Sequence, residues 1–327
     1  MASHAQVIAA RNAAAMAGSV ELVANELGVD GAAIGAFLLA NPVPYLRACR
    51  VAVPSSLDAV ELLAFHPGHF DHEDLERVAT AAGVPPERVP PLGAVALGHE
   101  VRGLYAGLAL ARAAAPALPL VVDARWGPWG LADALGLLGA SERARTAARE
   151  ALEPLPGAAG HLLGLTVGAD GAARVDAMRV VHYDAPGDTP AVAAALGRLV
   201  ARLGLPRAHA DWLEDRLPRL RPGPSSHDVL VSVTLDDAAG LAPSVALDFV
   251  ALPTLVALDA LDGLGFDVAL GGALSTIESV LSVPHDDEGR RWLDGLRVVL
   301  GEGARPRVEF AWFVEPERFQ SLTATLN

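Results

Sequence analysis

Imidazole and carboxylate groups are densest over residues 66–74, which read His-Pro-Gly-His-Phe-Asp-His-Glu-Asp. Such groups at short spacing are typical ligands of divalent transition metals. His66, His69, Asp71 and His72 are therefore candidate metal ligands of a hydrolase. The same residues also suit a helix start, because Asp71 can cap a helix and acidic residues favour its positive N-terminal end. Both interpretations stay open from the sequence.

A second unusual segment is Arg125-Trp126-Gly127-Pro128-Trp129. Two of the five tryptophans stand here in a proline-glycine turn, where burial of a large ring is harder. Exposed tryptophan and arginine are enriched at binding hot spots. Arg125, Trp126 and Trp129 are therefore candidate ligand-binding residues, unless both rings pack on the outside of the fold.

The clearest strands come later in the chain. An Asp170-Gly171 turn between the apolar runs 161–167 and 173–183 predicts a hairpin, and the turn 236–240 between 228–235 and 244–251 predicts another. A last strand is expected over 307–314, with Phe310 and Trp312 in the core. In the second hairpin, Val229, Val231 and Val233 alternate with polar residues. One apolar and one mixed face are typical of antiparallel sheets.

The strands supply further candidate ligand-binding residues. Ser232, Thr234 and Asp248 lie on the mixed faces of the second hairpin. Arg179 and Tyr183 share one face of the strand 173–183, and Arg174 lies on the other. In the second hairpin, alternation thus places the polar groups on one side of the sheet, opposite an apolar side.

Helices are expected between the strand pairs, where apolar residues recur at helical spacing. A first strand is expected over 59–66. The predicted helices span 18–40 (two short helices), 72–82, 96–114, 189–203, 208–217, 254–264, 270–282 and 286–300. The order strand, strand, helix, helix occurs twice, with a spacing near 68 residues between Tyr183 and Ala251. This indicates an internal repeat, although any helix that ends in glycine gives a similar pattern.

A tandem αββα unit of this kind resembles the barrel of the ABBA aromatic prenyltransferases, one branch of which acts on ribosomal peptides. The resemblance implies an α+β fold: an antiparallel β/α barrel, closed or incomplete, over residues 55–327 after a helical segment at 1–54. It also implies an isoprenyl diphosphate held by arginine and lysine, tyrosines that shield a carbocation, and an aromatic acceptor. No sequence motif carries the resemblance, so no site residue is transferred from the family.

The chain departs from that family in its cations. Its 25 Lys+Arg residues are all arginine, and it has three tyrosines. The absence of lysine also excludes P-loop, protein-kinase and Schiff-base chemistry. We therefore expect a non-catalytic peptide- or ligand-binding protein with a prenyltransferase-like fold, an accessory factor in peptide natural-product biosynthesis. The alternatives are an active prenyltransferase that uses an isoprenyl diphosphate and the metal-dependent hydrolase.

Net charge narrows the classes of binding partner, and the cysteine content limits the disulfides that the chain can form. The net charge of −14 disfavours nucleic acid and anionic membranes, and the single Cys49 excludes an internal disulfide. The first residues lack the pattern of a secretory signal, which predicts a cytoplasmic protein. We expect no cofactor, and as partners a peptide or small apolar ligand and a partner enzyme.

Overall fold

A closed antiparallel barrel of ten strands dominates the computed structural model, which describes residues 4–40, 49–66, 72–86, 89, 104–123, 130–156, 158–170, 172–182, 188–220, 228–261, 268–281, 283 and 292–314. Each strand pairs with the next one along the chain, and the first strand pairs with the last. Closure removes the unpaired edges that an open sheet would expose.

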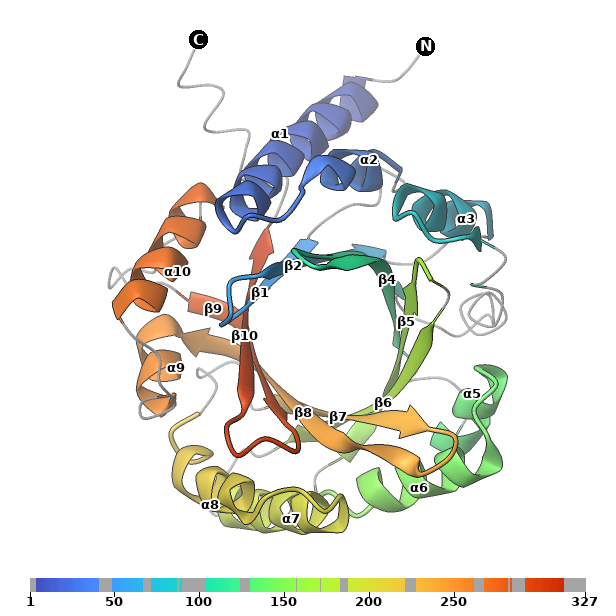
Figure 1. Ribbon diagram of the computed structural model, residues 1–327, viewed down its shortest axis with the longest axis vertical. Helices are drawn as coiled ribbons and strands as arrows, with labels where there is room; N and C mark the ends of the chain where they lie inside the picture. The colour runs from blue at the N-terminus through green and yellow to red at the C-terminus, as the bar shows by residue number, and fades with distance from the viewer. Residues whose placement is uncertain are drawn as a thin grey trace.

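The strands form five consecutive pairs: β1 (Cys49–Pro54) with β2 (Ala59–His66), β3 (Leu104–Ala111) with β4 (Ala114–Asp123), β5 (Ala158–Gly168) with β6 (Ala173–His182), β7 (Asp228–Asp236) with β8 (Gly240–Pro253), and β9 (Trp292–Leu300) with β10 (Arg307–Val314). The helices between them form an outer ring around the barrel (Figure 1).

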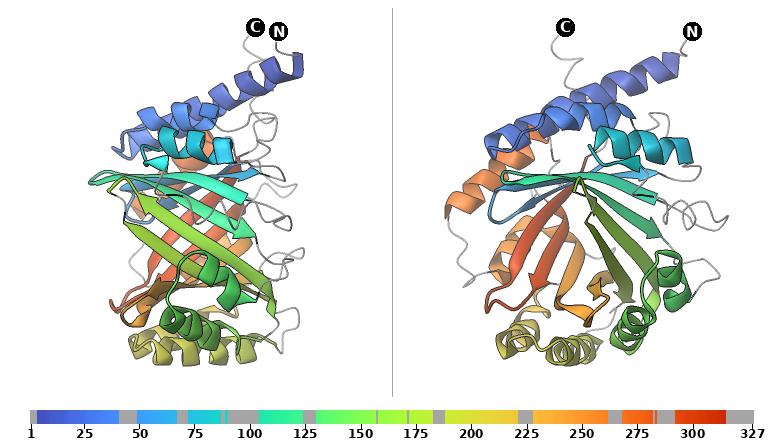
Figure 2. Two further views of the ribbon diagram at one scale, coloured as in Figure 1. Left: turned by 90° about the vertical axis from the view of Figure 1, so that its right-hand side faces the viewer. Right: turned by 45° about the vertical axis from the view of Figure 1, so that its right-hand side comes forward.

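Their bounds are α1 (His4–Glu26), α2 (Ala32–Ala40), α3 (His72–Ala81), α5 (Leu131–Leu137), α6 (Glu142–Leu152), α7 (Asp188–Arg202), α8 (Arg207–Arg216), α9 (Thr254–Ala260) and α10 (Val268–Val280). Two strands followed by two helices is thus the repeating unit, as the internal repeat predicts. The side views in Figure 2 show the strands tilted relative to the barrel axis, with helices on the outside only.

The hydrophobic core lies between the barrel wall and the helices. Val229, Val231 and Val233 of β7 are almost completely buried on the outer face, as their alternation predicts. Phe310 and Trp312 of β10 are also 0% exposed, which confirms their expected place in the core. Because the apolar face points outward to the helices, the mixed face must point into the lumen. A barrel of ten strands is wider than the eight-stranded barrels whose interiors side chains can fill.

Three parts of the predicted secondary structure are wrong. Residues 104–111 are β3 and not helix, and residues 292–300 are β9 and not helix; the rest of those two predicted helices lies largely outside the described residues. Alanine and leucine, both strong helix formers, make up six of the eight residues of the first segment, but pairing with β2 and β4 overrides that preference. Residues 49–54, expected within a helical segment, form β1, which closes the barrel against β10.

None of the described helices has the length and apolarity needed to cross a membrane.

Candidate functional site

The barrel lumen contains a cavity of about 300 Å³. Its described lining falls into an ionic wall and an apolar wall. The ionic wall has Arg50, Glu61, Asp248, Asp294 and Arg297. The other lining residues include the separate charged pair Arg174 and Asp176 together with Leu63, Tyr105, Val121, Leu162, Met178, Leu230 and Phe313. A concave, largely apolar space with a few convergent charges is the usual form of a small-molecule site.

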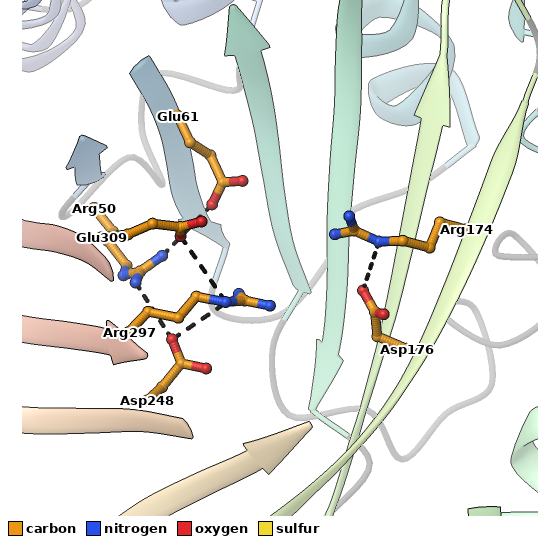
Figure 3. Close-up of polar contacts among 7 residues, drawn as sticks. All are labelled: Arg50, Glu61, Arg174, Asp176, Asp248, Arg297 and Glu309. Carbon is orange, nitrogen blue, oxygen red and sulfur yellow. Dashed lines mark hydrogen bonds and ion pairs between the residues drawn. The ribbon is translucent and has the colours of Figure 1, made fainter. Parts of the chain in front are cut away.

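Five charged side chains from neighbouring strands form one network on the ionic wall (Figure 3). Arg50 of β1 lies 3.5 Å from Glu61 of β2 and 3.6 Å from Asp248 of β8. Arg297 of β9 lies 3.9 Å from both Asp248 and Glu309. Strand register creates these contacts, because Arg297 stands directly opposite Asp248 on one side and Glu309 on the other. Asp248 therefore links the two guanidinium groups.

Burial and charge act on this network together. The neighbouring carboxylates, Asp248 above all, hold the pKa of Arg297 above its ordinary value despite the burial that lowers it. Burial raises the pKa of Glu309, while Arg297 opposes that change and the nearby Glu61 charge adds to it. Two like charges so close together disfavour ionisation of both. The network thus contains three carboxyl groups and two guanidinium groups, and Glu309 is the carboxyl whose ionisation is disfavoured.

A smaller polar group lies apart from this network in Figure 3 and comes from β6 and β7. The Arg174 Nε donates to Asp176 at 3.2 Å, and the hydroxyl of Thr234 donates to the other Asp176 oxygen at 2.6 Å. Ser232, two residues before Thr234, faces the lumen between Met178 and Ala246 of the neighbouring strands. Its hydroxyl is buried and has no hydrogen-bond partner among the described residues.

Two glycines allow neighbouring groups to lie close against the inner face of the barrel. A Cβ at Gly107 would lie 2.5 Å from the carbonyl oxygen of Leu62 and 2.7 Å from Pro119. A Cβ at Gly164 would lie 2.5 Å from the terminal methyl of Met178. Gly107 therefore needs glycine for space, since the backbone oxygen of Leu62 cannot move away, whereas at Gly164 the end of the Met178 side chain can shift.

Charge decides which ligands the lumen favours. The described cavity lining contains three guanidinium groups and four carboxylates, and each guanidinium lies within 4 Å of at least one carboxylate. A diphosphate carries several negative charges and needs cations that are free to converge on it. In the described part of the lumen, such a ligand would have to displace carboxylates from the arginines.

The structure brings together three of the predicted ligand-binding residues. Ser232, Thr234 and Asp248 all lie on the lumen side, and Asp248 and Thr234 take part in the two polar groups. Arg179 does not join them. It lies on the outer face of β6, where it donates to the carbonyl oxygen of Leu152 at the end of α6 at 2.9 Å. Arg125, Trp126, Trp129 and Tyr183 lie outside the described residues.

The candidate metal ligands lie around the end of β2 and the start of α3. His66 ends β2 and His72 begins α3, but their side chains and residues 67–71 are outside the described part. Among the side chains that are described, no group of three or more histidine, cysteine, aspartate or glutamate residues is arranged to hold a metal. The helix start predicted here is present as α3, with Glu73 and Asp74 in its first turn.

Sequence reasoning missed most of the ionic network. Arg50 was assigned to a helical segment, and Arg297 to a helix that is in fact β9. A signal was available at both places: Arg50 precedes Val51 and Val53, and Arg297 alternates with Leu296 and Val298. Period-two alternation of this kind predicts a strand whose charged residues face away from the core.

No family model and no curated protein matches the sequence. Solved structures do match. The prenyltransferase PriB in its apo form is 18% identical, with a TM-score of 0.64 over 95% of this chain and 97% of that one. The 5-dimethylallyltryptophan synthase of Streptomyces coelicolor is 14% identical, with a TM-score of 0.65 over 94% and 98%.

The 6-dimethylallyltryptophan synthase of Micromonospora olivasterospora, in complex with DMASPP and Trp, is 15% identical, with a TM-score of 0.65 over 95% and 98%. PriB also has a ternary complex with L-tryptophan and dimethylallyl thiolodiphosphate. The chain therefore has the ABBA prenyltransferase barrel fold, as its repeated αββα order predicts.

Proposed function

We propose that this chain is a ligand-binding barrel that does not transfer prenyl groups. Its lumen takes a small molecule or a short peptide segment with an apolar part, and the protein serves as an accessory factor in natural-product biosynthesis, with a peptide or a partner enzyme as its partner. The structures of similar fold are prenyltransferases. This chain would thus have the same barrel fold but bind a different ligand in its lumen.

One observation carries this proposal: the arginines of the described lumen are already neutralised. Arg50 and Arg297 share Asp248, and each has a further carboxylate within 4 Å. Arg174 lies beside Asp176 and is half-exposed. A diphosphate would face repulsion from these carboxylates in a cavity where charges are weakly screened. The chain also has no lysine that could replace the missing free cations.

An active prenyltransferase is the second candidate. It is favoured by the match over nearly the full length to structures such as PriB. Three guanidinium groups line one cavity together with aromatic residues that include Tyr105 and Phe313. An enzyme of this kind would have to release Arg50 and Arg297 from their carboxylates when the diphosphate enters.

Calorimetry with dimethylallyl thiolodiphosphate, followed by an assay with dimethylallyl diphosphate and L-tryptophan, separates the two candidates. The proposed function predicts no binding at micromolar concentration and no prenylated product. A matched titration with PriB provides the positive control. Micromolar binding, or a prenylated product of any acceptor, would favour the transferase and reject the proposal.

A further inference from the structure

We propose that the lumen is built for a cation: a small organic ammonium ion that carries an apolar or aromatic group. This inference rests on the proposed function, because it names the class of ligand that the non-catalytic barrel would hold. Three features of the lumen support it: its charge balance, the distances within its ion pairs and the apolar side chains that face the ionic wall.

The first feature is the balance of carboxylate and guanidinium groups in the cavity lining. Among the described residues, the cavity lining has one more carboxylate than guanidinium groups, and Glu309 adds a further carboxyl to the same network. A cation entering the cavity would neutralise this surplus. An anion would increase it, and a neutral ligand would leave it unchanged.

The distances within the network leave the carboxylates with free capacity. The four contacts among Arg50, Arg297 and their carboxylates measure 3.5 to 3.9 Å. A good charge-assisted hydrogen bond is about 2.7–2.9 Å long. Each carboxylate has two oxygens that accept from about four directions. Glu61 and Glu309 are each about one-third exposed toward the lumen, so they can accept from a ligand without losing the arginines.

A second polar feature of the lumen is independent of these acids. Ser232 is 3% exposed, and its hydroxyl has no hydrogen-bond partner among the described residues. A buried hydroxyl without a partner costs free energy. Ser232 comes from the lumen face of β7, beside Met178 of the cavity lining. A ligand that moves Met178 aside would uncover this polar group next to the cavity.

The facing wall suits the apolar part of such a ligand. Leu162, Met178 and Val180 pack together as a separate apolar cluster inside the barrel, with Val121 and Leu230 against them. Tyr105 and Phe313 add aromatic rings to the lining. An ammonium group is attracted to the face of an aromatic ring as well as to carboxylates. A ligand with a charged end and an apolar end therefore matches both walls.

Three ligands that share one ring test this inference: tryptamine, a cation; indole-3-ethanol, which is neutral; and indole-3-propionate, an anion. Calorimetry with the full chain should give the tightest binding for tryptamine, by about tenfold or more over the neutral analogue. Its affinity should fall as salt rises, since part of the attraction is electrostatic. The substitution Glu61→Gln should weaken tryptamine binding about fivefold or more and leave the neutral analogue unchanged. Glu302→Gln, the same change on an exposed turn, is the matched control and should change neither.

Equal binding of all three compounds, a preference for the anion, or no binding by any of them would overturn the inference. An equal effect of Glu61→Gln and Glu302→Gln would do so too. These results are independent of the test with dimethylallyl thiolodiphosphate. Preference for the cation together with tight diphosphate binding would reject the proposed function but keep the inference.

Discussion

Arg297 stands directly opposite Asp248 across the β8–β9 pairing, with 3.9 Å between their charged atoms. The same Asp248 oxygen lies 3.6 Å from Arg50. One carboxylate thus holds two guanidinium groups that a barrel of this fold could otherwise turn toward an anionic ligand. This relationship is the basis of the first two predictions.

The substitution Asp248→Asn should destabilise the protein. It leaves two largely buried guanidinium groups without their shared carboxylate, which we expect to cost about 1–3 kcal/mol of unfolding free energy. Urea denaturation measures this change. Asp211→Asn is the matched control, since Asp211 pairs with Arg207 on the surface, where both side chains are well exposed; the expected cost there is below about 0.5 kcal/mol. Equal effects of the two substitutions would contradict the prediction.

Freeing the arginines should create affinity for phosphate. In the double variant Glu61→Gln, Asp248→Asn, Arg50 loses both contacting carboxylates and Arg297 loses one of two. Calorimetry with inorganic pyrophosphate should then show binding roughly tenfold tighter than to the unaltered chain. The variant Asp211→Asn, Glu302→Gln changes the net charge equally but outside the lumen, and it should show no gain. A gain in both variants would mean that overall charge, and not the lumen network, limits phosphate binding.

Glu309 should make stability depend on pH. Burial raises the pKa of its carboxyl in the folded chain above the ordinary glutamate value, so the folded state holds this proton more tightly than the unfolded state. Its contribution to the unfolding free energy therefore falls as pH rises from the ordinary glutamate pKa through the raised one. Denaturation of the chain and of Glu309→Gln at several pH values checks this. The unfolding free energy of the unaltered chain minus that of the variant should decrease as pH rises. If this difference increased with pH, the pKa of Glu309 would be lowered in the folded chain, which would contradict the prediction.

Two glycine substitutions on the lumen side should behave differently. Gly107→Ala places a methyl group against the backbone oxygen of Leu62, which cannot move away, and we expect a loss of about 1–3 kcal/mol. Gly164→Ala meets the flexible end of Met178 and, at 3.2 Å, the Cβ of Asp176; because the Met178 methyl can move aside, a smaller loss, about 1 kcal/mol, is expected. Because Gly164 and Met178 both line the cavity, this second variant should bind lumen ligands more weakly while its melting temperature falls less than that of Gly107→Ala. Similar melting temperatures for the two variants would contradict the distinction.

The sequence by itself determined the repeated order of strand pairs and helix pairs, the later hairpins and the faces of their strands. Val229, Val231 and Val233 alternate with Ser232 and Thr234, and this pattern already separates an apolar face from a polar one. Alternation follows from the geometry of a strand, so it can be seen without any knowledge of the neighbouring strands.

Only the tertiary structure decided which polar residues meet. Arg50 and Asp248 are far apart in the chain and come within 3.6 Å because β1 pairs with β10 to close the barrel, and β10 is followed by β9 and β8. The strand character of 104–111 and 292–300 was hidden for a similar reason: alanine and leucine suit helices locally, and pairing with adjacent strands overrides that preference. The carboxylates around Arg50 and Arg297 come from strands β2, β8 and β10. Their meeting depends on barrel closure and strand register, which no local pattern in the sequence encodes.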